Sequence, residues 1–311
     1  HECHGFYICM SMKKITLSGS AIMLAAMAGF FALRGCQAPD ELPPVKVYRS
    51  KTQQVEQLSL EQYVLGTVAA EMPASFELEA LKAQAVCART YALRKMIEGK
   101  DYPRGADLSD DITTCQAYVN AEEFAELHPW QNEQLWAKIQ QAVDETRGEV
   151  ILYDNQLIDA LYHSTCGGQT ESARELYGKE ITYLQSVPCE YCRQSKYYLT
   201  EHHFTWQQVS RLAGKGQSIQ VLAATSSGRI QKIKVNQKAM SGSEFRSAFG
   251  LPSTWCTIGY YSQGITITSR GYGHGMGLCQ YGAQGMALQG KNYRQILAHY
   301  YPKTQLYKLP Y

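Results

Sequence analysis

The stretch from Leu58 to Ile97 constrains the fold most strongly, because it predicts two consecutive helices separated by a sharp break. The first helix carries an apolar stripe with i, i+3, i+4, i+7 spacing, formed by Leu65, Val68, Ala69 and Met72. Ser59, followed by Glu61 and Gln62, predicts its N-cap. Pro73 predicts its end, since proline disfavours a helical residue before it.

The second helix is expected from about Leu78 to Ile97. Small alanines along it would let another element approach closely. Lys82 and Arg89 are seven residues apart and share one side of this helix. They form either a solvated face or a cationic rim beside Glu71.

Glu71 closes a run of small apolar residues at the end of the first helix. It is either an ordinary helix-end carboxylate or a proton donor in a partly dry site. Burial raises the pKa of a carboxyl group, so a buried glutamate can stay protonated near neutral pH and donate its proton.

The rest of the chain mixes helices with hairpin strands in no regular βαβ order, which predicts an α+β fold. Asp154-Asn155 lies between two short apolar runs within residues 149–163 and signals a hairpin. Further helices are expected at 135–146 and 293–300, and strands at 220–235 and 264–269. We expect these helices and antiparallel hairpin sheets to surround a substrate groove.

Composition excludes some functions and leaves others open. The net charge of +2 does not indicate a nucleic-acid binder. The chain has 22 tyrosines against 8 phenylalanines, which suits sugar surfaces but equally suits a protein core. No GxSxG, HExxH or kinase signature occurs, which disfavours serine hydrolases and zinc proteases.

The N-terminal residues predict an extracytoplasmic protein. Residues 1–11 read as an extension before a start at Met12. Lys13 and Lys14 precede an apolar run, so residues 12–36 form a signal peptide or a membrane anchor. Cys36 ends a loose lipoprotein cleavage box, but we favour an uncleaved anchor. A proline-rich tether at 37–46 leads to one folded domain at 47–311.

Cysteine spacing leaves a metal site open. Seven of the ten cysteines lie in the folded domain, and Cys189 and Cys192 form a CxxC pair. Such a pair alone is a zinc half-site, a redox pair or chance. Zinc completed by Cys115, Cys166 or His163 and a structural disulfide remain equal alternatives. A thiol-redox protein is a third, weaker hypothesis.

Two glycine-rich motifs supply polar groups beside flexible backbone. The segment 163–171 (HSTCGGQTE) is either a polar turn or part of a binding site. The segment 271–282 (GYGHGMGLCQYG) matches neither the dinucleotide-binding nor the phosphate-loop pattern. The segment 110–118 is expected to be a polar loop.

Three separated stretches resemble the signatures of the stage II sporulation protein D (SpoIID/LytB) family. They are EQYVLGTVAAEMPASFELEALKAQAVCARTYALR at 61–94, HSTCGGQTES at 163–172 and the segment from Ser269 to Leu306. Their order matches that family, and the similarity spans roughly Val47 to Leu306.

The resemblance implies a membrane-anchored lytic transglycosylase of peptidoglycan that acts during forespore engulfment. It would cut glycan strands already stripped of stem peptides by a partner amidase/endopeptidase on a shared membrane scaffold. Glu71 matches the family's catalytic glutamate, and no cofactor is required. The motif positions imply these substrate-binding residues: Lys82, Gln84, Arg89, Tyr91, His163, Ser164, Thr165, His274, Gln280 and Tyr281.

The chain departs from the family at two cysteines, because Cys166 and Cys279 stand where serine is common. Zinc therefore stays an open option, with Cys115, Cys166, Cys189 and Cys192 as ligands of a structural ion or partners in a disulfide. The alternative function is a non-catalytic wall-binding protein that enhances an amidase. The retained Glu71 favours catalysis, since a pure binder does not need it.

Overall fold

The computed structural model describes residues 42 and 44–311 of the chain. The expected extension at 1–11 and the expected anchor at 12–36 lie outside these residues. The first strand starts at Val45, so the end of the expected tether belongs to the fold. Within the part described, no helix combines the length and apolar character required for a membrane span.

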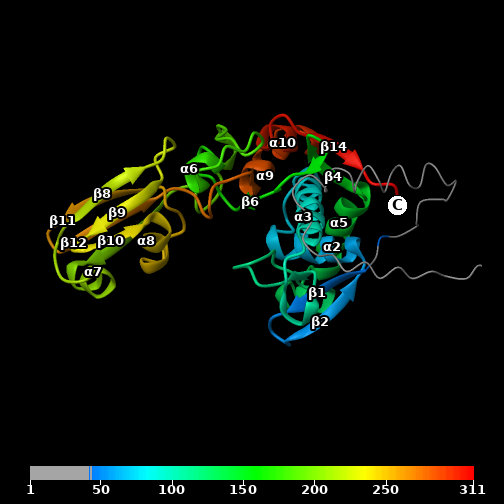
Figure 1. The fold of residues 1–311 in the computed structure, drawn as a ribbon, viewed down its shortest axis with the longest axis horizontal. Helices are drawn as coiled ribbons and strands as arrows, with labels where there is room; N and C mark the ends of the chain where they lie inside the picture. The colour runs from blue at the N-terminus through cyan, green and yellow to red at the C-terminus, as the bar shows by residue number, and fades with distance from the viewer. Residues whose placement is uncertain (1–41, 43) are drawn as a thin grey trace, which may run out of the picture.

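One end of the molecule is a helical lobe, residues 45–146 (Figure 1). Its helices α2 and α3 pack against each other and against α5. A small sheet in the order β2-β1-β3 lies beside them. The bounds are β1 Val45–Arg49, β2 Gln54–Leu58, α2 Leu60–Glu71, α3 Leu78–Glu98, η1 Pro103–Gly105, β3 Leu108–Ser109, α4 Ala121–Leu127 and α5 Asn132–Glu145.

Local signals explain why these helices were predictable. Ser59 caps α2 through a capping box: its Oγ accepts from Gln62 N at 3.2 Å, and Gln62 Oε1 accepts from Ser59 N at 2.9 Å. Met72 leaves the helix with extended backbone before Pro73. The predictions of α2, α3 and α5 are therefore confirmed.

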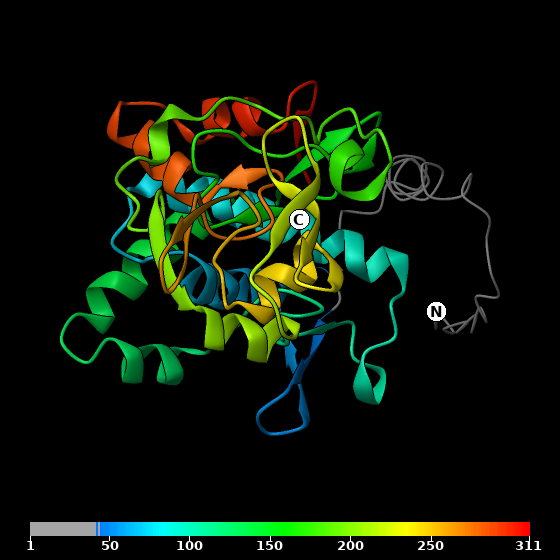
Figure 2. The same cartoon turned by 90° about the vertical axis from the view of Figure 1, so that its left-hand side faces the viewer.

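The opposite end is a strand lobe, residues 200–269, which has its own apolar core (Figures 1 and 2). Two antiparallel three-stranded sheets, β10-β9-β8 and β11-β12-β7, carry α7 and α8. The bounds are β7 Thr200–Thr205, α7 Trp206–Ala213, β8 Ile219–Ala224, β9 Ile230–Val235, β10 Lys238–Ser241, α8 Gly242–Ala248, β11 Cys256–Tyr261 and β12 Gly264–Ser269.

The strand expected over 220–235 is wrong as a single element. A turn closed by the bond from Gly228 N to Thr225 O divides it into the hairpin β8–β9. Gly228 has a φ of +90°, a conformation that favours glycine and breaks a strand. The strand expected at 264–269 is confirmed as β12.

A central segment, residues 147–199 and 270–308, joins the lobes (Figure 1). The predicted hairpin turn is confirmed: Asp154 and Asn155 both have positive φ, as a type I′ turn requires. The bounds are β4 Glu149–Tyr153, β5 Gln156–Leu157, β6 Tyr162–His163, α6 Ala173–Tyr177, η2 Glu190–Cys192, β13 Leu278–Cys279, α9 Gln280–Leu288, α10 Tyr293–Tyr300 and β14 Gln305–Lys308.

The strand β6 pairs in parallel with β13, and β1 pairs in parallel with β3. The fold is α+β as predicted, but its sheets are not all antiparallel. The β6–β13 pair places the second glycine-rich motif directly beside the third. These two motifs and the end of α2 meet at one place on the surface.

Candidate active site

A cleft of about 880 Å³ opens where the two lobes and the central segment meet. The end of α2 forms one wall with Glu71, and the 110–119 loop continues it. The opposite wall is built by residues 162–164, 272–274 and 280–281 of the two glycine-rich motifs. Arg246 of α8 closes the side toward the strand lobe.

Glu71 is the last residue of α2, so the helix fixes its backbone while its carboxyl group faces the cleft. Ala117 N donates to its Oε1 at 2.7 Å and sets the side-chain orientation. Burial raises the pKa of Glu71, while the hydrogen bond from the Ala117 amide partly opposes the rise. The carboxyl therefore holds its proton to a higher pH than an exposed glutamate does.

Tyr162 of β6 lies next to Glu71, and its hydroxyl proton is already used. Tyr162 donates to Gln116 Oε1 at 2.8 Å. The Gln116 atom that faces Tyr162 is the amide oxygen, because the amide nitrogen Nε2 donates to Ala88 O at 3.4 Å and to Tyr63 OH at 3.2 Å. This chain of polar groups holds the Tyr162 ring in place beside the carboxyl.

Gln280 connects α9 to the end of α2. Its Nε2 donates to the main-chain oxygen of Glu71 at 2.9 Å and to Gln84 Oε1 at 3.2 Å. Gln84 is fully buried behind it. Gln280 therefore lines the cleft as predicted, whereas Gln84 supports it from the core and does not reach the cleft.

Two histidines of the glycine-rich motifs face each other with ring centroids 5.6 Å apart. His163 donates from Nδ1 to Met276 O at 2.9 Å, so its Nε2 carries the lone pair. Burial and the nearby His274 lower the pKa of His163 well below its usual range, so the ring is neutral. His274 Nδ1 accepts from Met276 N at 3.0 Å, which leaves its proton on Nε2.

Close packing explains the glycines of the third motif. A Cβ on Gly277 would lie 1.9 Å from Leu161 O, and one on Gly271 would lie 2.5 Å from Thr165 O. Both residues also have positive φ. Only glycine lets this loop lie against β6 and the segment after it.

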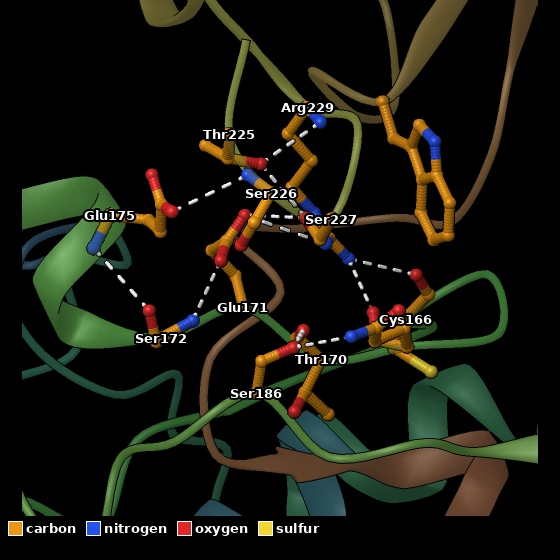
Figure 3. A network of polar contacts seen from close by, with 12 residues as sticks. Cys166, Thr170, Glu171, Ser172, Glu175, Ser186, Thr225, Ser226, Ser227 and Arg229 are labelled. Atoms are coloured by element: carbon orange, nitrogen blue, oxygen red, sulfur yellow. Dashed lines mark hydrogen bonds and ion pairs between the residues drawn. The ribbon is translucent and has the colours of Figure 1, made fainter.

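A buried ion pair joins the strand lobe to the second motif (Figure 3). Arg229, at the end of the lobe's β8–β9 turn, donates from Nη2 to Cys166 O at 2.9 Å and to Gln169 O at 2.7 Å. Its Nη1 lies 3.7 Å from Glu171 Oε2, and Ser227 Oγ bonds to the same carboxylate oxygen at 2.6 Å. These contacts hold the cleft wall against the lobe that carries Arg246.

The predicted cationic rim beside Glu71 is wrong. Arg89 is fully buried, with Nε and Nη2 bonded to the two oxygens of Glu61 at 2.9 and 2.6 Å. Lys82 is paired with Glu79 and Glu145 away from the cleft. Periodicity showed that these two cations share a helix side, but not that this side packs on the protein core.

Two other predicted residues also lie elsewhere. Thr165 is 1 % exposed and hydrogen-bonded to Ser195 Oγ at 2.7 Å, so it supports the wall from behind. Tyr91 is not a cleft residue, and Lys95 Nζ lies 5.3 Å from its ring centroid. The predicted residues that the structure brings together are Glu71, His163, Ser164, His274, Gln280 and Tyr281.

Sequence reasoning missed several residues that line the cleft, among them two tyrosines and two cations. The rings of Tyr197 and Tyr272 lie 4.5 Å apart and form an aromatic surface. Lys196 and Arg246 are the cations among the lining residues. Tyr272 and its neighbour His274 lie in the quoted motif, so tyrosine there was a usable signal, whereas Lys196 and Arg246 lie in unremarkable sequence.

Asp110 is the other carboxylate of the cleft, and its charge is already compensated. It accepts from Arg49 Nε at 2.9 Å, from Ser50 N at 2.7 Å and from Ser50 Oγ at 2.6 Å. Glu71 has no cationic partner among the described residues. The site thus contains one carboxyl group that is free to exchange a proton.

The predicted cysteine set needs one correction. Cys166, Cys189 and Cys192 lie together, but the fourth member is Cys279. Cys115 instead lies near Tyr63 and Tyr102 in the helical lobe. Sequence spacing could not reveal Cys279, because the β6–β13 pairing brings it to Cys166 from far along the chain.

The comparisons with known proteins match the part of the chain that carries Glu71 and most of the remaining chain. A family model described as "Stage II sporulation protein" matches residues 48–153, which include Glu71 and both flanking helices. The chain is 36 % identical over 269 residues to "Stage II sporulation protein D" of Bacillus subtilis, covering 84 % of this chain and 78 % of that protein.

Two further relatives show how far the similarity reaches. "Stage II sporulation protein D" of Bacillus amyloliquefaciens is 37 % identical over 263 residues, covering 83 % of this chain and 76 % of that protein. A more distant relative, "Amidase enhancer" of Bacillus subtilis, is 28 % identical over 300 residues, or 78 % of this chain and 40 % of that protein.

Proposed function

The chain belongs to the stage II sporulation protein D family, and on this basis we propose that it is a peptidoglycan lytic transglycosylase. It cleaves the bond between N-acetylmuramic acid and N-acetylglucosamine in peptide-stripped strands during forespore engulfment. The observation that carries the proposal is the single proton-exchanging carboxyl of the cleft, Glu71, whose pKa is raised by burial. Hydrolases with two catalytic carboxyls need a second free one, which the described cleft does not offer.

In the first step Glu71 acts as a general acid. The protonated carboxyl gives its proton to the glycosidic oxygen as the bond from that oxygen to C1 of the muramic residue breaks. The raised pKa keeps more of Glu71 protonated than an exposed glutamate would be at the same pH. The Ala117 amide at 2.7 Å holds the carboxyl in one orientation during the transfer.

In the second step the same group acts as a general base. The ionised Glu71 takes the proton of the muramic 6-hydroxyl while its oxygen forms a bond to C1. The product is a 1,6-anhydro end, and Glu71 regains the proton that it gave away. The reaction uses no water and no second carboxyl group. This agrees with Asp110, whose charge is already paired with Arg49.

The cleft also supports a preference for stripped strands. Removal of the stem peptide leaves a free lactyl carboxylate on each muramic residue. Lys196 and Arg246 are the cations among the lining residues, and they suit such an anion. Tyr197 and Tyr272 offer flat faces for the sugar rings.

The partners and the location follow from this activity. An amidase or endopeptidase would supply stripped strands, and the relative named "Amidase enhancer" supports an association with such an enzyme. The expected anchor at 12–36 would hold the domain on the outer side of the membrane, within reach of the wall.

The test is mass spectrometry of the products from stripped and from peptide-bearing glycan. We expect products that are lighter by one water than hydrolysis products, and only from stripped strands. Reducing-end products would instead identify a hydrolase. Uncut strands together with faster turnover of an added amidase would support the alternative, a non-catalytic amidase enhancer.

A further inference from the structure

Four cysteines outside the cleft converge on one point of the central segment. Cys166 follows β6, Cys189 directly precedes the short helix η2, Cys192 is the last residue of η2, and Cys279 is the last residue of β13. All four are fully buried, and their sulfur atoms lie within 4.8 Å of one another. We propose that these four thiolates bind one structural zinc ion.

The spacing of the sulfur atoms fits a shared centre. Tetrahedral zinc with Zn–S bonds of about 2.3 Å places its ligand sulfurs about 3.8 Å apart. The sulfurs of Cys166 and Cys192 are 3.5 Å apart, and every other pair is within 4.8 Å. Two disulfides would require only two close pairs and give no reason for all four thiols to converge.

The surroundings supply donors to the sulfur atoms. Cys279 Sγ accepts from Cys166 N at 3.2 Å and from Gly282 N at 3.3 Å. Cys279 is the N-cap residue of α9, so its sulfur lies beside the free backbone amides of the helix end. The hydroxyl of Tyr300 lies 3.1 Å from Cys189 Sγ. Such outer contacts orient thiolate ligands and stabilise their charge.

The charge balance also fits a metal–thiolate centre. Zinc with four thiolates carries a net charge of −2, which is costly in a buried place without a cation nearby. Arg229 is 1 % exposed and donates to the main-chain oxygen of Cys166 at 2.9 Å (Figure 3). Its guanidinium also lies 3.7 Å from the Glu171 carboxylate, so it offsets part of the combined negative charge.

The ion would stabilise the cleft, although it does not line it. Cys279 pairs with His163 in the β6–β13 register and is followed directly by Gln280. Cys166 follows Ser164 by two residues. Zinc would thus fix the two segments that carry the wall opposite Glu71, as structural zinc sites do elsewhere.

The experiment is metal analysis and spectroscopy of the purified full-length protein. We expect one zinc per chain, no disulfide among these four cysteines, and, after cobalt exchange, the intense charge-transfer bands of a tetrahedral cobalt–thiolate site. Chelation should lower the melting temperature. These measurements on the unmodified chain decide the proposal even if a variant does not fold.

Variants locate the site. Cys279→Ser and Cys192→Ser should each reduce bound zinc by at least tenfold. Cys256→Ser, a buried cysteine of the strand lobe, and Cys115→Ser should keep one zinc per chain. A metal-free protein with these thiols in disulfides, bound iron in place of zinc, or zinc retained by Cys279→Ser and lost from Cys115→Ser would each overturn the proposal.

Discussion

At the residue scale, Glu71 combines a rigid backbone with a partly buried acid group. Its position at the end of α2 was readable from the sequence, because the apolar stripe and Pro73 fix where the helix ends. The cause of its raised pKa was not readable. Burial arises from the 110–119 loop and from β6, which reach Glu71 only through the tertiary fold.

The first prediction concerns stability. The pKa of Glu71 is higher in the folded protein than in the unfolded chain. Glu71 therefore stabilises the fold fully below the ordinary glutamate pKa, and this stabilisation is lost as pH rises through the pKa of the folded state. Glu71→Gln removes the ionisation. The variant should therefore gain stability relative to the wild type at neutral pH, by about 1.4 kcal/mol for each unit of pKa shift.

Urea unfolding at acidic and at neutral pH measures this difference. Glu201→Gln, an exposed carboxyl of β7, serves as the control and should show no such change with pH. An identical stability difference between Glu71→Gln and wild type at both pH values would mean that Glu71 titrates normally.

A second prediction concerns the aromatic surface. In a Glu71→Gln background, Tyr197→Ala or Tyr272→Ala should weaken binding of stripped glycan by roughly 0.5–1.5 kcal/mol each, because a ring face is lost. Tyr260→Ala, an exposed tyrosine on β11, is the matched control. Calorimetry with glycan fragments measures the three affinities. Equal affinities for all three variants would show that these two rings do not bind the glycan.

At the element scale, α2 and α3 are joined by the buried pair of Glu61 and Arg89. Glu61 also accepts from Gly148 N and from the Tyr311 hydroxyl, so one carboxylate ties two helices to the central segment and to the C-terminal residues. Sequence periodicity found both helices, whereas the motif positions assigned Arg89 to the substrate. A pattern of seven-residue spacing cannot separate a core-facing cation from a cleft-facing one.

The third prediction follows from this burial. Arg89→Met should reduce the free energy of unfolding by about 3–5 kcal/mol, because Glu61 then remains as an unpaired buried charge. The double variant Glu61→Gln/Arg89→Met should recover part of the loss. Lys95→Ala removes a partly exposed pair with Glu98 and should cost at most about 1 kcal/mol.

Denaturant unfolding gives these values. If Arg89→Met kept the stability of the wild type while glycan affinity fell, the arginine would contact substrate after all, and the structural role assigned to it would be incorrect.

The elements that the sequence did not predict depend on long-range pairing. The parallel pair β6–β13 joins segments more than a hundred residues apart and consists of two residues in each strand. Such short strands carry no periodicity of their own. Likewise the turn within 220–235 was hidden by apolar residues on both sides of it.

At the scale of the whole molecule, the cleft exists because two lobes with separate cores meet at the central segment. The three sequence motifs lie in the helical lobe and the central segment, so they predicted only those walls. The strand lobe contributes Arg246 through α8, outside every quoted motif. Only the structure, which places α8 beside the other walls, shows that Arg246 lines the cleft.

The fourth prediction tests this contribution. Arg246→Gln should weaken binding of stripped strands by about 1.5–3 kcal/mol, as expected for a charge-assisted hydrogen bond, and should reduce the salt dependence of binding. Peptide-bearing strands, which lack the free lactyl carboxylate, should be affected less. Arg211→Gln on α7, which is exposed and outside the cleft, controls for net charge.

Affinity measurements at low and high salt provide the readout. An equal loss for stripped and peptide-bearing strands, or no loss for either, would contradict the assignment of Arg246 to the lactyl carboxylate.

The most direct test of Glu71 as the single acid and base is the rate at which 1,6-anhydro products form from stripped glycan, measured against pH. The wild type and Glu201→Gln should form them, with a rate that falls as pH rises through the raised pKa of Glu71. Glu71→Gln should be slower by a factor of about 10²–10⁴ at pH values below that pKa and should lose this pH dependence. Product formation by Glu71→Gln at a rate close to that of the wild type would contradict the account.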